Sequence, residues 1–331
     1  MLPPVVYSLI LYGQPGNDPN YYYTMNTITV TCPATVSNLC CGFDILGMAL
    51  NEPYDRLTLT VREQPGILIT HTDAYNLSTN PVENVAGIAL QAMINELKIE
   101  HGFEITIAKN IKPGSGIGSS AASAAGVIAA ANILLGIGLS RQEQIRFAME
   151  GEKVASGALH ADNVAPCMYG GIVLIRDTAL LDIIELTFPA MFVTILHPQI
   201  EIKTSYAREI LPAKILLKDA VKQWANVAGL ITGLLQCDYP LISRSLEDVI
   251  IEPVRAKLIP GYDLVKEICI EAGVLGGGIS GSGPSVFMLS ENEKIANDAE
   301  VVMKDIYIKL GIDFKTYVTT INKNGIEPVI N

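Results

Sequence analysis

The sequence predicts an α+β protein of two domains, and three observations support that prediction. The chain has 331 residues, which is enough for two ordinary domains. Hydrophobic residues make up 49% and charged residues 17%, a balance that supports a large core and argues against disorder. The closing strand–helix–strand pattern indicates an antiparallel sheet with helices on one face. We place the domain boundary near residue 187, between domains at 25–187 and 188–331.

Alternation of apolar and polar residues predicts the strands, and apolar residues at helical spacing predict the helices. In the first domain we expect strands at 27–31, 55–61, 67–69, 103–108 and 170–175, and helices at 84–97, along the Ala-rich segment up to residue 140, and at 140–155. In the second we expect strands at 192–196, 285–289 and 315–321, and helices near 204–210, 214–236, 239–248, 261–272 and 293–310.

The first 24 residues differ from the rest of the chain. They contain no Lys or Arg, so the basic region of a secretory signal is missing. Strand-like sequence begins just after Met25. We therefore expect Met25 to be the biological start, and residues 1–24 to be a non-native or disordered leader.

Charge and cysteine content limit the partners. The net charge of -11, from 34 acidic and 23 basic residues, argues against nucleic acid and membrane surfaces. The cysteines form no C-x-x-C pair, which argues against a zinc site and favours a reducing cytoplasm. They are Cys32, Cys40, Cys41, Cys167, Cys237 and Cys269. Residues 113–140 carry no charge, but they are rich in Ala, Gly and Ser, which predicts a buried helix and no membrane span.

The strongest chemical signal is a glycine-rich run that leads into the Ala-rich helix. Glycines let a backbone approach an anion closely, and a helix N-terminus offers free N–H groups. Hydroxyls in the first turn can cap the helix, contact phosphate or bind Mg²⁺. A tight turn with capping serines is the alternative. The chain has no Gly-Lys-Ser/Thr and hence no Walker A loop. The run is Pro113, Gly114, Ser115, Gly116, Ile117, Gly118, Ser119, Ser120, Ala121, Ala122 and Ser123.

Three further segments carry polar groups. Residues 150–166 contain Glu152, His160, Asp162 and Asn163, and a carboxylate near a phosphate loop is the expected Mg²⁺ ligand. Taken singly, each of these residues also fits a structural role. Asp44 ends the segment 38–44, where a turn aspartate is the alternative.

The segment 276–285 contains a formal G-x-G-x-x-G. A dinucleotide site would need a strand before this motif and a helix after it. Here a helix precedes it and a strand follows, so we predict a glycine-rich loop near the ligand or the other domain.

These four segments occur in the same order in the GHMP kinases (galactokinase, homoserine kinase, mevalonate kinase, phosphomevalonate kinase), which the chain resembles from Met25 onward. The glycine run resembles that superfamily's second motif, and SGSGPS resembles its third. Three stretches resemble the homoserine kinase branch: PATVSNLCCGFDILGMAL, LHADNVAPCMYGG and EDVIIEPVRAKLIPGY. One departure is Cys40-Cys41, where the family usually has Gly-Pro or a similar pair, so the backbone near Asn38 can differ.

The resemblance implies a two-domain fold, with an N-terminal domain like domain 2 of ribosomal protein S5 and a ferredoxin-like C-terminal domain. It implies a homoserine kinase that uses ATP and Mg²⁺ in threonine biosynthesis. The loop 113–123 would hold the ATP phosphates, Asn84 would lie near adenine, and Ser120 and Glu152 would bind Mg²⁺. The homoserine site would be lined by Asn38, Asp44, His160, Asn163, Arg208, Arg255, Gly281 and Gly283.

The chemistry of homoserine fits that set. Asp44 can pair with its ammonium, and Arg208 and Arg255 can bind its carboxylate. Asn38 and Asn163 can orient the hydroxyl. Asp162 is a candidate general base; otherwise positioning and charge neutralisation carry phosphoryl transfer.

Two other functions stay open at this point. One is a GHMP kinase for another alcohol, such as mevalonate or shikimate, and the other is a non-catalytic ligand sensor on the same fold. The sequence does not decide the oligomeric state, and a homodimer is among the alternatives.

Overall fold

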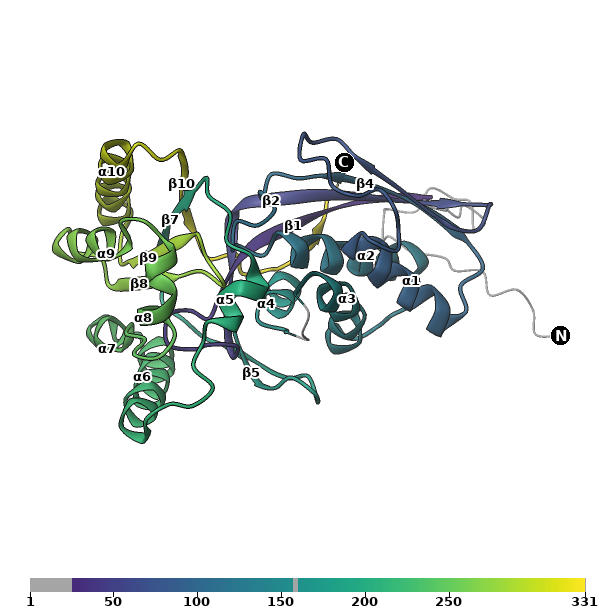
Figure 1. Cartoon of the computed structure of the whole chain (residues 1–331). Coiled ribbons are helices and arrows are strands. Elements are labelled where there is room, and N and C mark those ends of the chain that lie inside the picture. Colours follow the sequence, from purple (N-terminus) through teal and green to yellow (C-terminus); the bar gives the residue numbers. More distant parts are fainter. Residues whose placement is uncertain (1–25, 157–159, 331) are drawn as a thin grey trace, which may run out of the picture.

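The computed structural model describes residues 26–156 and 160–330. The predicted leader at 1–24 lies outside the described residues. Two sheets, each covered by helices, form two lobes that meet at the centre of the molecule (Figure 1). The α+β prediction is confirmed.

The first lobe is a seven-stranded sheet whose central path runs β11-β1-β2-β4-β3. The long strand β2 pairs with β1, β4 and β5 along different parts of its length, and β3 lies parallel to β4. The strands are β1 (Thr27–Ser37), β2 (Leu46–Arg62), β3 (Ile67–His71), β4 (Gly102–Ala108), β5 (Ile172–Asp177), β6 (Asp182–Leu186) and β11 (Glu327–Pro328).

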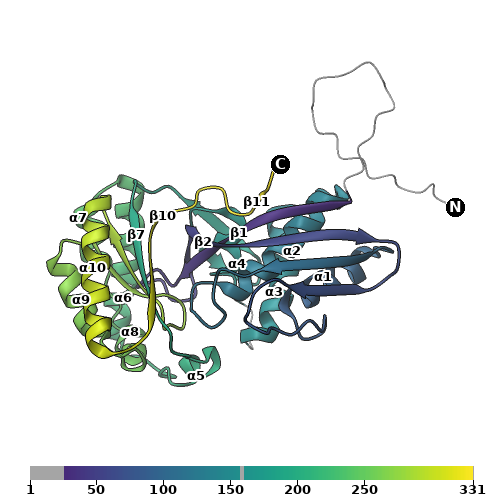
Figure 2. The same cartoon turned by 90° about the horizontal axis from the view of Figure 1, so that it is seen from above.

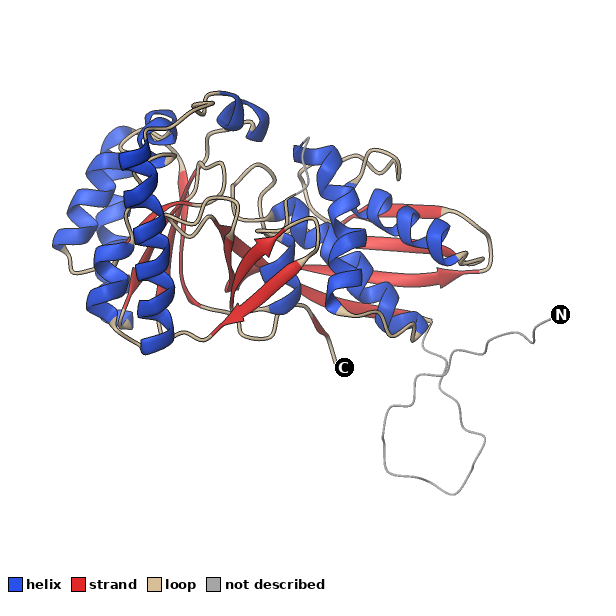
Figure 3. Cartoon of the chain, turned by 90° about the horizontal axis from the view of Figure 1, so that it is seen from below, coloured by secondary structure: helices blue, strands red, loops and turns tan. Residues whose placement is uncertain are grey.

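Helices cover one face of this sheet, as Figure 3 shows from below. They are α1 (Val85–Leu97), α2 (Ser119–Leu135), α3 (Arg141–Ser156) and α4 (Val164–Tyr169). Helix α2 is almost entirely buried and lies close to β1, because a Cβ added at Gly126 would be 2.4 Å from the Cys32 sulfur. Small side chains therefore let this uncharged helix pack onto the sheet. Across the described residues, no helix is both long and apolar enough to cross a bilayer.

The second lobe is a four-stranded antiparallel sheet in the order β10-β7-β9-β8. Its strands are β7 (Phe192–Pro198), β8 (Gly276–Ile279), β9 (Val286–Ser290) and β10 (Phe314–Thr320). The long helices lie on its outer side (Figure 1). The helices are α5 (Thr204–Glu209), α6 (Leu217–Gln236), α7 (Tyr239–Ser245), α8 (Glu252–Arg255), the 3-10 turn η1 (Ala256–Leu258), α9 (Tyr262–Glu271) and α10 (Glu293–Leu310).

The end of the chain returns to the first lobe. Strand β11 pairs with β1, so the C-terminal segment runs back alongside the first sheet (Figure 2). The backbone N–H of Glu52 also donates to the Thr319 hydroxyl at 3.0 Å. The predicted boundary near 187 lies between β6 and β7. Strands on both sides of it contribute to the first sheet, so the boundary does not separate the two sheets cleanly and stays a prediction.

Sequence reasoning was wrong about part of the late glycine segment. Residues 276–279 form strand β8, paired antiparallel with β9, and only the following residues form a turn. The first three of its four residues are glycines, and the neighbouring chain leaves no room for a side chain at Gly277. A Cβ at Gly277 would lie 1.9 Å from the Phe287 carbonyl oxygen. Strand β6 and helix α4 were not predicted at all.

Candidate active site

One cavity of about 390 Å³ lies where the lobes meet, and residues of both lobes line it. Its lining includes most of the predicted site residues: Asn38, Asp44, Asn84, Pro113–Gly116, Gly118–Ser120, Ser123, Glu152, His160, Asp162, Asn163, Arg208, Arg255 and Gly281. The lining does not include Ile117, Ala121, Ala122 and Gly283. The first three are buried apolar residues of the core, and Gly283 packs behind the glycine run.

The glycine run forms an open cradle at the start of α2. Gly114, Gly116 and Gly118 all have positive φ, at 72°, 80° and 74°, a conformation that favours glycine. Gly118 is the N-cap of α2, and no side chain caps the helix. The free N–H groups and the positive end of the helix dipole therefore face the cavity, as an anion requires.

The turn after β8 closes the back of this cradle. The Ser280 hydroxyl donates to the Gly116 carbonyl at 2.7 Å, and the Ser285 N–H donates to the Ser115 carbonyl at 3.2 Å. A Cβ at Gly116 would lie 2.6 Å from the Gly283 carbonyl oxygen, so only glycine fits this contact. The second lobe thus holds the shape of the glycine run in the first.

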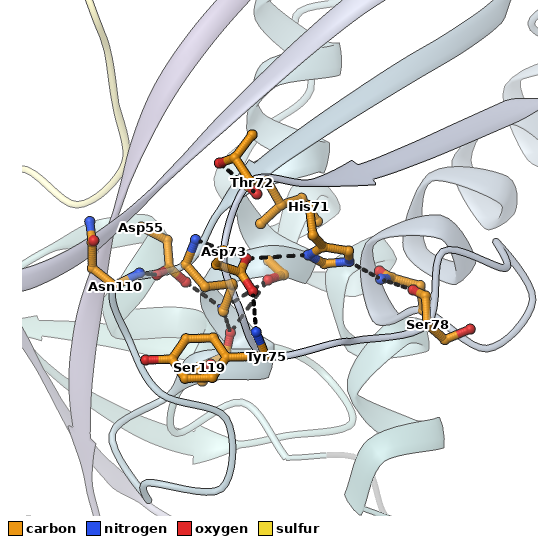
Figure 4. A network of polar contacts seen from close by, with 12 residues as sticks. Asp55, His71, Thr72, Asp73, Tyr75, Ser78, Asn110 and Ser119 are labelled. Atoms are coloured by element: carbon orange, nitrogen blue, oxygen red, sulfur yellow. Dashed lines mark hydrogen bonds and ion pairs between the residues drawn. The ribbon is translucent and has the colours of Figure 1, made fainter.

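A buried ion pair anchors the first turn of α2 to the sheet (Figure 4). The Lys109 ammonium pairs with Asp55, and both side chains are 1% exposed. It also donates to the Ser119 carbonyl at 2.6 Å and to the Ser123 hydroxyl at 3.1 Å. The other Asp55 oxygen accepts the N–H groups of Asn110 and Ile111. These bonds satisfy both charges, as burial requires.

The same network extends to the start of α1. The Lys109 N–H donates to Asp73, whose carboxylate lies 3.5 Å from His71 Nδ1. His71 Nε2 lies 3.2 Å from the Asn84 amide nitrogen, which also donates to the Ser78 carbonyl at 2.8 Å. The Asn84 amide oxygen caps α1 by accepting the Ala86 N–H. The Asn84 amide is therefore engaged in hydrogen bonds within the protein, and these bonds hold this end of the cavity in shape.

Glu152 and Ser120 meet at the floor of the cradle. Burial raises the pKa of the Glu152 carboxyl to about 6, and a hydrogen bond from Ser120 opposes that shift. A buried carboxylate next to a hydroxyl, beside a site for phosphate, offers two oxygen ligands of the kind that Mg²⁺ prefers. The donor set therefore fits a magnesium ion.

The other end of the cavity contains a cluster of charges. Arg208 of α5 donates through Nη2 to both carboxylate oxygens of Asp44, each at 2.7 Å. His160 Nδ1 lies 3.6 Å from the same carboxylate. Burial lowers the pKa of His160, although the Asp44 charge acts in the opposite direction.

Arg255 is more deeply placed than its predicted role implies. It is buried, and it donates from Nε to the Ala207 carbonyl at 3.0 Å and from Nη1 to the Gly281 carbonyl at 2.8 Å. Its guanidinium carbon lies 5.1 Å from the centre of the Phe43 ring. Arg255 thus ties α5 to the late turn while still lining the cavity.

Asp162 and Asn163 meet through Ser37 of β1. The Asn163 amide donates to the Ser37 hydroxyl at 3.0 Å, and its amide oxygen accepts the Thr35 hydroxyl at 2.7 Å. Ser37 in turn donates to Asp162. Burial raises the pKa of Asp162 to about 7, and the neighbouring Asp44 charge adds to the rise. A carboxyl with such a pKa can exchange a proton near neutral pH.

The loop that carries Asn38 and Asp44 has an uncommon backbone. Asn38, Leu39, Cys40 and Asp44 all have positive φ. Asn38 stabilises this path, because its amide accepts the Asp44 N–H at 3.1 Å and donates to the Gly281 carbonyl at 3.0 Å. Cys40 therefore adopts a backbone conformation that favours glycine.

Sequence reasoning missed several residues of the site. Asp55 begins one predicted strand and Lys109 directly follows another, and no motif distinguished them from solvated charges. Their pairing depends on the register of β2 and β4, in which Arg56 lies opposite Ala108. Ser37 lay inside a quoted motif but was not selected. His71 is an isolated histidine at the end of β3, and nothing near it in sequence pointed to Asn84.

Comparisons with known proteins bear on the family of the chain. The family models for the N-terminal and C-terminal domains of the GHMP kinases match residues 83–171 and 230–309. A homoserine kinase of Chloroherpeton thalassium is 44% identical over 299 residues, which cover 86% of this chain and 94% of that protein. A homoserine kinase of Methanococcus vannielii is 40% identical over 286 residues, with 86% and 94% covered.

Solved structures show the same fold. The crystal structure of homoserine kinase from Cytophaga hutchinsonii superimposes with a TM-score of 0.90 at 43% identity, covering 94% of this chain and all of that one. The mevalonate kinase of L. major in complex with R-mevalonate gives a TM-score of 0.67 at 15% identity, covering 88% and 95%. The second likeness bears on the fold alone.

Proposed function

The chain belongs to the homoserine kinases of the GHMP kinase superfamily, and from this premise we propose how its cavity transfers the γ-phosphoryl group of ATP to the hydroxyl of L-homoserine. The product is O-phospho-L-homoserine, a precursor of threonine. One observation carries the proposal: a single cavity joins an anion cradle at the start of α2 to a cluster of Asp44, Arg208 and Arg255. The cysteines of the chain are free thiols, which supports a cytoplasmic enzyme.

The cradle would hold the phosphates of ATP. Phosphate oxygens need donors, and this acidic chain supplies them chiefly as N–H groups at the start of α2, because the Ser119 hydroxyl already donates to the Ile111 carbonyl at 2.8 Å. The end of the cavity near His71, Leu77 and Asn84 would take the base. Arranged in this way, the γ-phosphate points toward the charged cluster.

Glu152 and Ser120 would hold Mg²⁺ beside the phosphates. When bound, the ion supplies positive charge that offsets the charge of the phosphates in the transition state. Burial makes the Glu152 carboxylate costly to ionise, which its raised pKa reflects, and the hydrogen bond from Ser120 offsets that cost only in part. A divalent cation would remove that cost, so the residue and the ion fit each other.

The charged cluster would bind homoserine by its two charges. Asp44 would receive the ammonium, and Arg208 and Arg255 the carboxylate. The hydroxyl would then face Asp162 and Asn163. Asp162 would accept the hydroxyl proton as the homoserine oxygen bonds to the γ-phosphorus and the bond from that phosphorus to ADP breaks, and Ser37 would hold the Asp162 carboxylate in place.

A substrate panel tests this function. With ATP and Mg²⁺, we expect the purified chain to phosphorylate L-homoserine far faster than mevalonate, galactose or shikimate, because only homoserine carries both charges. A coupled ADP-release assay measures the rates. Equal or higher turnover of another alcohol would contradict the proposed substrate, and no ADP release with any alcohol would favour a sensor.

Replacing Glu152 tests the metal site. We expect Glu152→Gln to lower kcat by about two orders of magnitude or more, because the neutral amide is a poorer ligand for Mg²⁺. Glu150→Gln is the matched control, since Glu150 lies on the same helix but is exposed. Both variants are assayed at saturating Mg²⁺, and near-normal turnover of Glu152→Gln would refute the assignment.

The pH dependence tests Asp162 as the base. The base must be ionised, so kcat of the wild type should rise as pH increases through about 7, the raised pKa of Asp162. Asp162→Asn should be slow and should lack this rise.

The stability of the wild-type protein should also depend on pH through Asp162, but in the opposite direction to kcat, because it should fall as pH rises. A carboxyl whose pKa is raised by folding destabilises the folded protein increasingly as pH rises from the pKa of the unfolded state, about 4, to that of the folded state. Asp162→Asn has no such carboxyl, so its free energy of unfolding should increase relative to that of the wild type over this pH range.

Full activity of the Asp162→Asn variant, with no change in the pH profile of kcat, would exclude Asp162 as the base.

A further inference from the structure

The Asp44–Arg208 ion pair occupies the place where the two charges of the substrate would bind. The two residues come from different lobes, Asp44 from the loop before β2 and Arg208 from α5. Both side chains line the cavity, and Arg208 Nη2 lies 2.7 Å from each carboxylate oxygen of Asp44. The site thus already contains one anion and one cation that neutralise each other.

We propose that L-homoserine binds by ion-pair exchange: its ammonium replaces Arg208 at Asp44, while its carboxylate replaces Asp44 at Arg208. This inference rests on the proposed function and concerns how that site selects its substrate. The exchange breaks one charge pair and forms two, because a zwitterion offers each partner a group of the correct sign. A ligand with only one charge breaks the pair and leaves either Asp44 or Arg208 without its partner.

The surroundings let the Arg208 side chain move while the backbone stays in place. The Asn38 amide oxygen accepts the Asp44 N–H at 3.1 Å, which holds the backbone of Asp44 in the loop. On α5, the Ala207 carbonyl accepts a hydrogen bond from buried Arg255, and this bond anchors the backbone of the helix. The Arg208 side chain is itself 37% exposed and therefore has room to swing.

Phe43 keeps the released guanidinium within the site. The guanidinium carbons of Arg208 and Arg255 lie 5.4 Å and 5.1 Å from the centre of its ring, a distance at which a cation is attracted to an aromatic face. Arg208 can thus turn away from Asp44 and remain beside Arg255. The two cations would then both face the substrate carboxylate.

The exchange makes selection for both charges cooperative. Binding must break the internal ion pair, so a ligand binds more weakly when it cannot give both residues of the pair a new partner. The ion pair therefore discriminates against compounds with one charge without any steric barrier. The exchange also predicts that substituting one residue of the pair strengthens the binding of the single-charge ligand that the remaining residue attracts.

The test measures dissociation constants for two such ligands by calorimetric titration of the full chain with ADP and Mg²⁺ present. 3-Aminopropan-1-ol carries only the ammonium, and it should bind Arg208→Met about threefold or more tightly than wild type, because Asp44 is then free. 4-Hydroxybutyrate carries only the carboxylate, and it should gain similarly in Asp44→Asn. L-Homoserine should bind both variants more weakly than wild type.

Lys203→Met is the matched control for simple charge repulsion. Lys203 is the N-cap of α5 and also lines the cavity, so this variant removes the same charge from the same helix. The gain for 3-aminopropan-1-ol in Arg208→Met must exceed that in Lys203→Met. Equal gains, or unchanged binding of both single-charge ligands, would overturn the exchange. Melting temperatures verify that each variant is folded.

Failure of this inference can be told from failure of the proposed function. If wild type phosphorylates homoserine but the single-charge ligands do not respond, only the exchange is wrong. If wild type does not phosphorylate homoserine, the proposed function itself is wrong.

Discussion

The buried Lys109–Asp55 ion pair is the interaction on which the nucleotide half of the site depends. It joins the sheet, through Asp55 of β2, to the first turn of α2, through Ser119 and Ser123. A separate bond, from the backbone N–H of Lys109 to Asp73, continues through His71 to the N-cap of α1. A buried pair contributes little net stability on its own, but loss of one partner leaves a charge in the core and costs about 3–5 kcal/mol. The pair therefore fixes where the start of α2 lies.

The two ends of the cavity use charge in opposite ways. At the phosphate end, Lys109 is saturated by Asp55 and by two oxygens of α2, so its role is to position the cradle. The attraction for phosphate there comes from N–H groups, which suits a chain of net charge -11. At the end proposed for homoserine, Asp44 and Arg208 are partly exposed and make a pair that a ligand would replace under the proposed exchange. Rigid charges would thus shape one half of the site, and exchangeable charges would select the ligand in the other.

Much of the fold was predictable because it depends on local pattern. The alternation at 55–61 predicted the second part of β2, the helical spacing at 84–97 predicted α1, and the glycine run predicted the cradle before α2. Residues that depend on tertiary pairing were not predictable. Lys109 and Asp55 meet only through the register of β2 and β4, and Gly276–Ile279 reads as a loop until β9 lies beside it. The charged cluster could be assembled from the family resemblance, but the Asp44–Arg208 contact within it could not.

The most direct test of this account is the affinity of Lys109→Met for ADP, measured by calorimetry in the presence of Mg²⁺. Lys222→Met serves as control, because the Lys222–Glu247 pair is about half exposed, at 52% and 50%, and such pairs contribute little. If Lys109 positions the cradle, the variant should bind ADP at least about tenfold more weakly and should also unfold more easily, since Asp55 keeps a buried, unpaired charge. The control should match wild type in both measurements. A folded Lys109→Met with wild-type affinity for ADP would contradict the account.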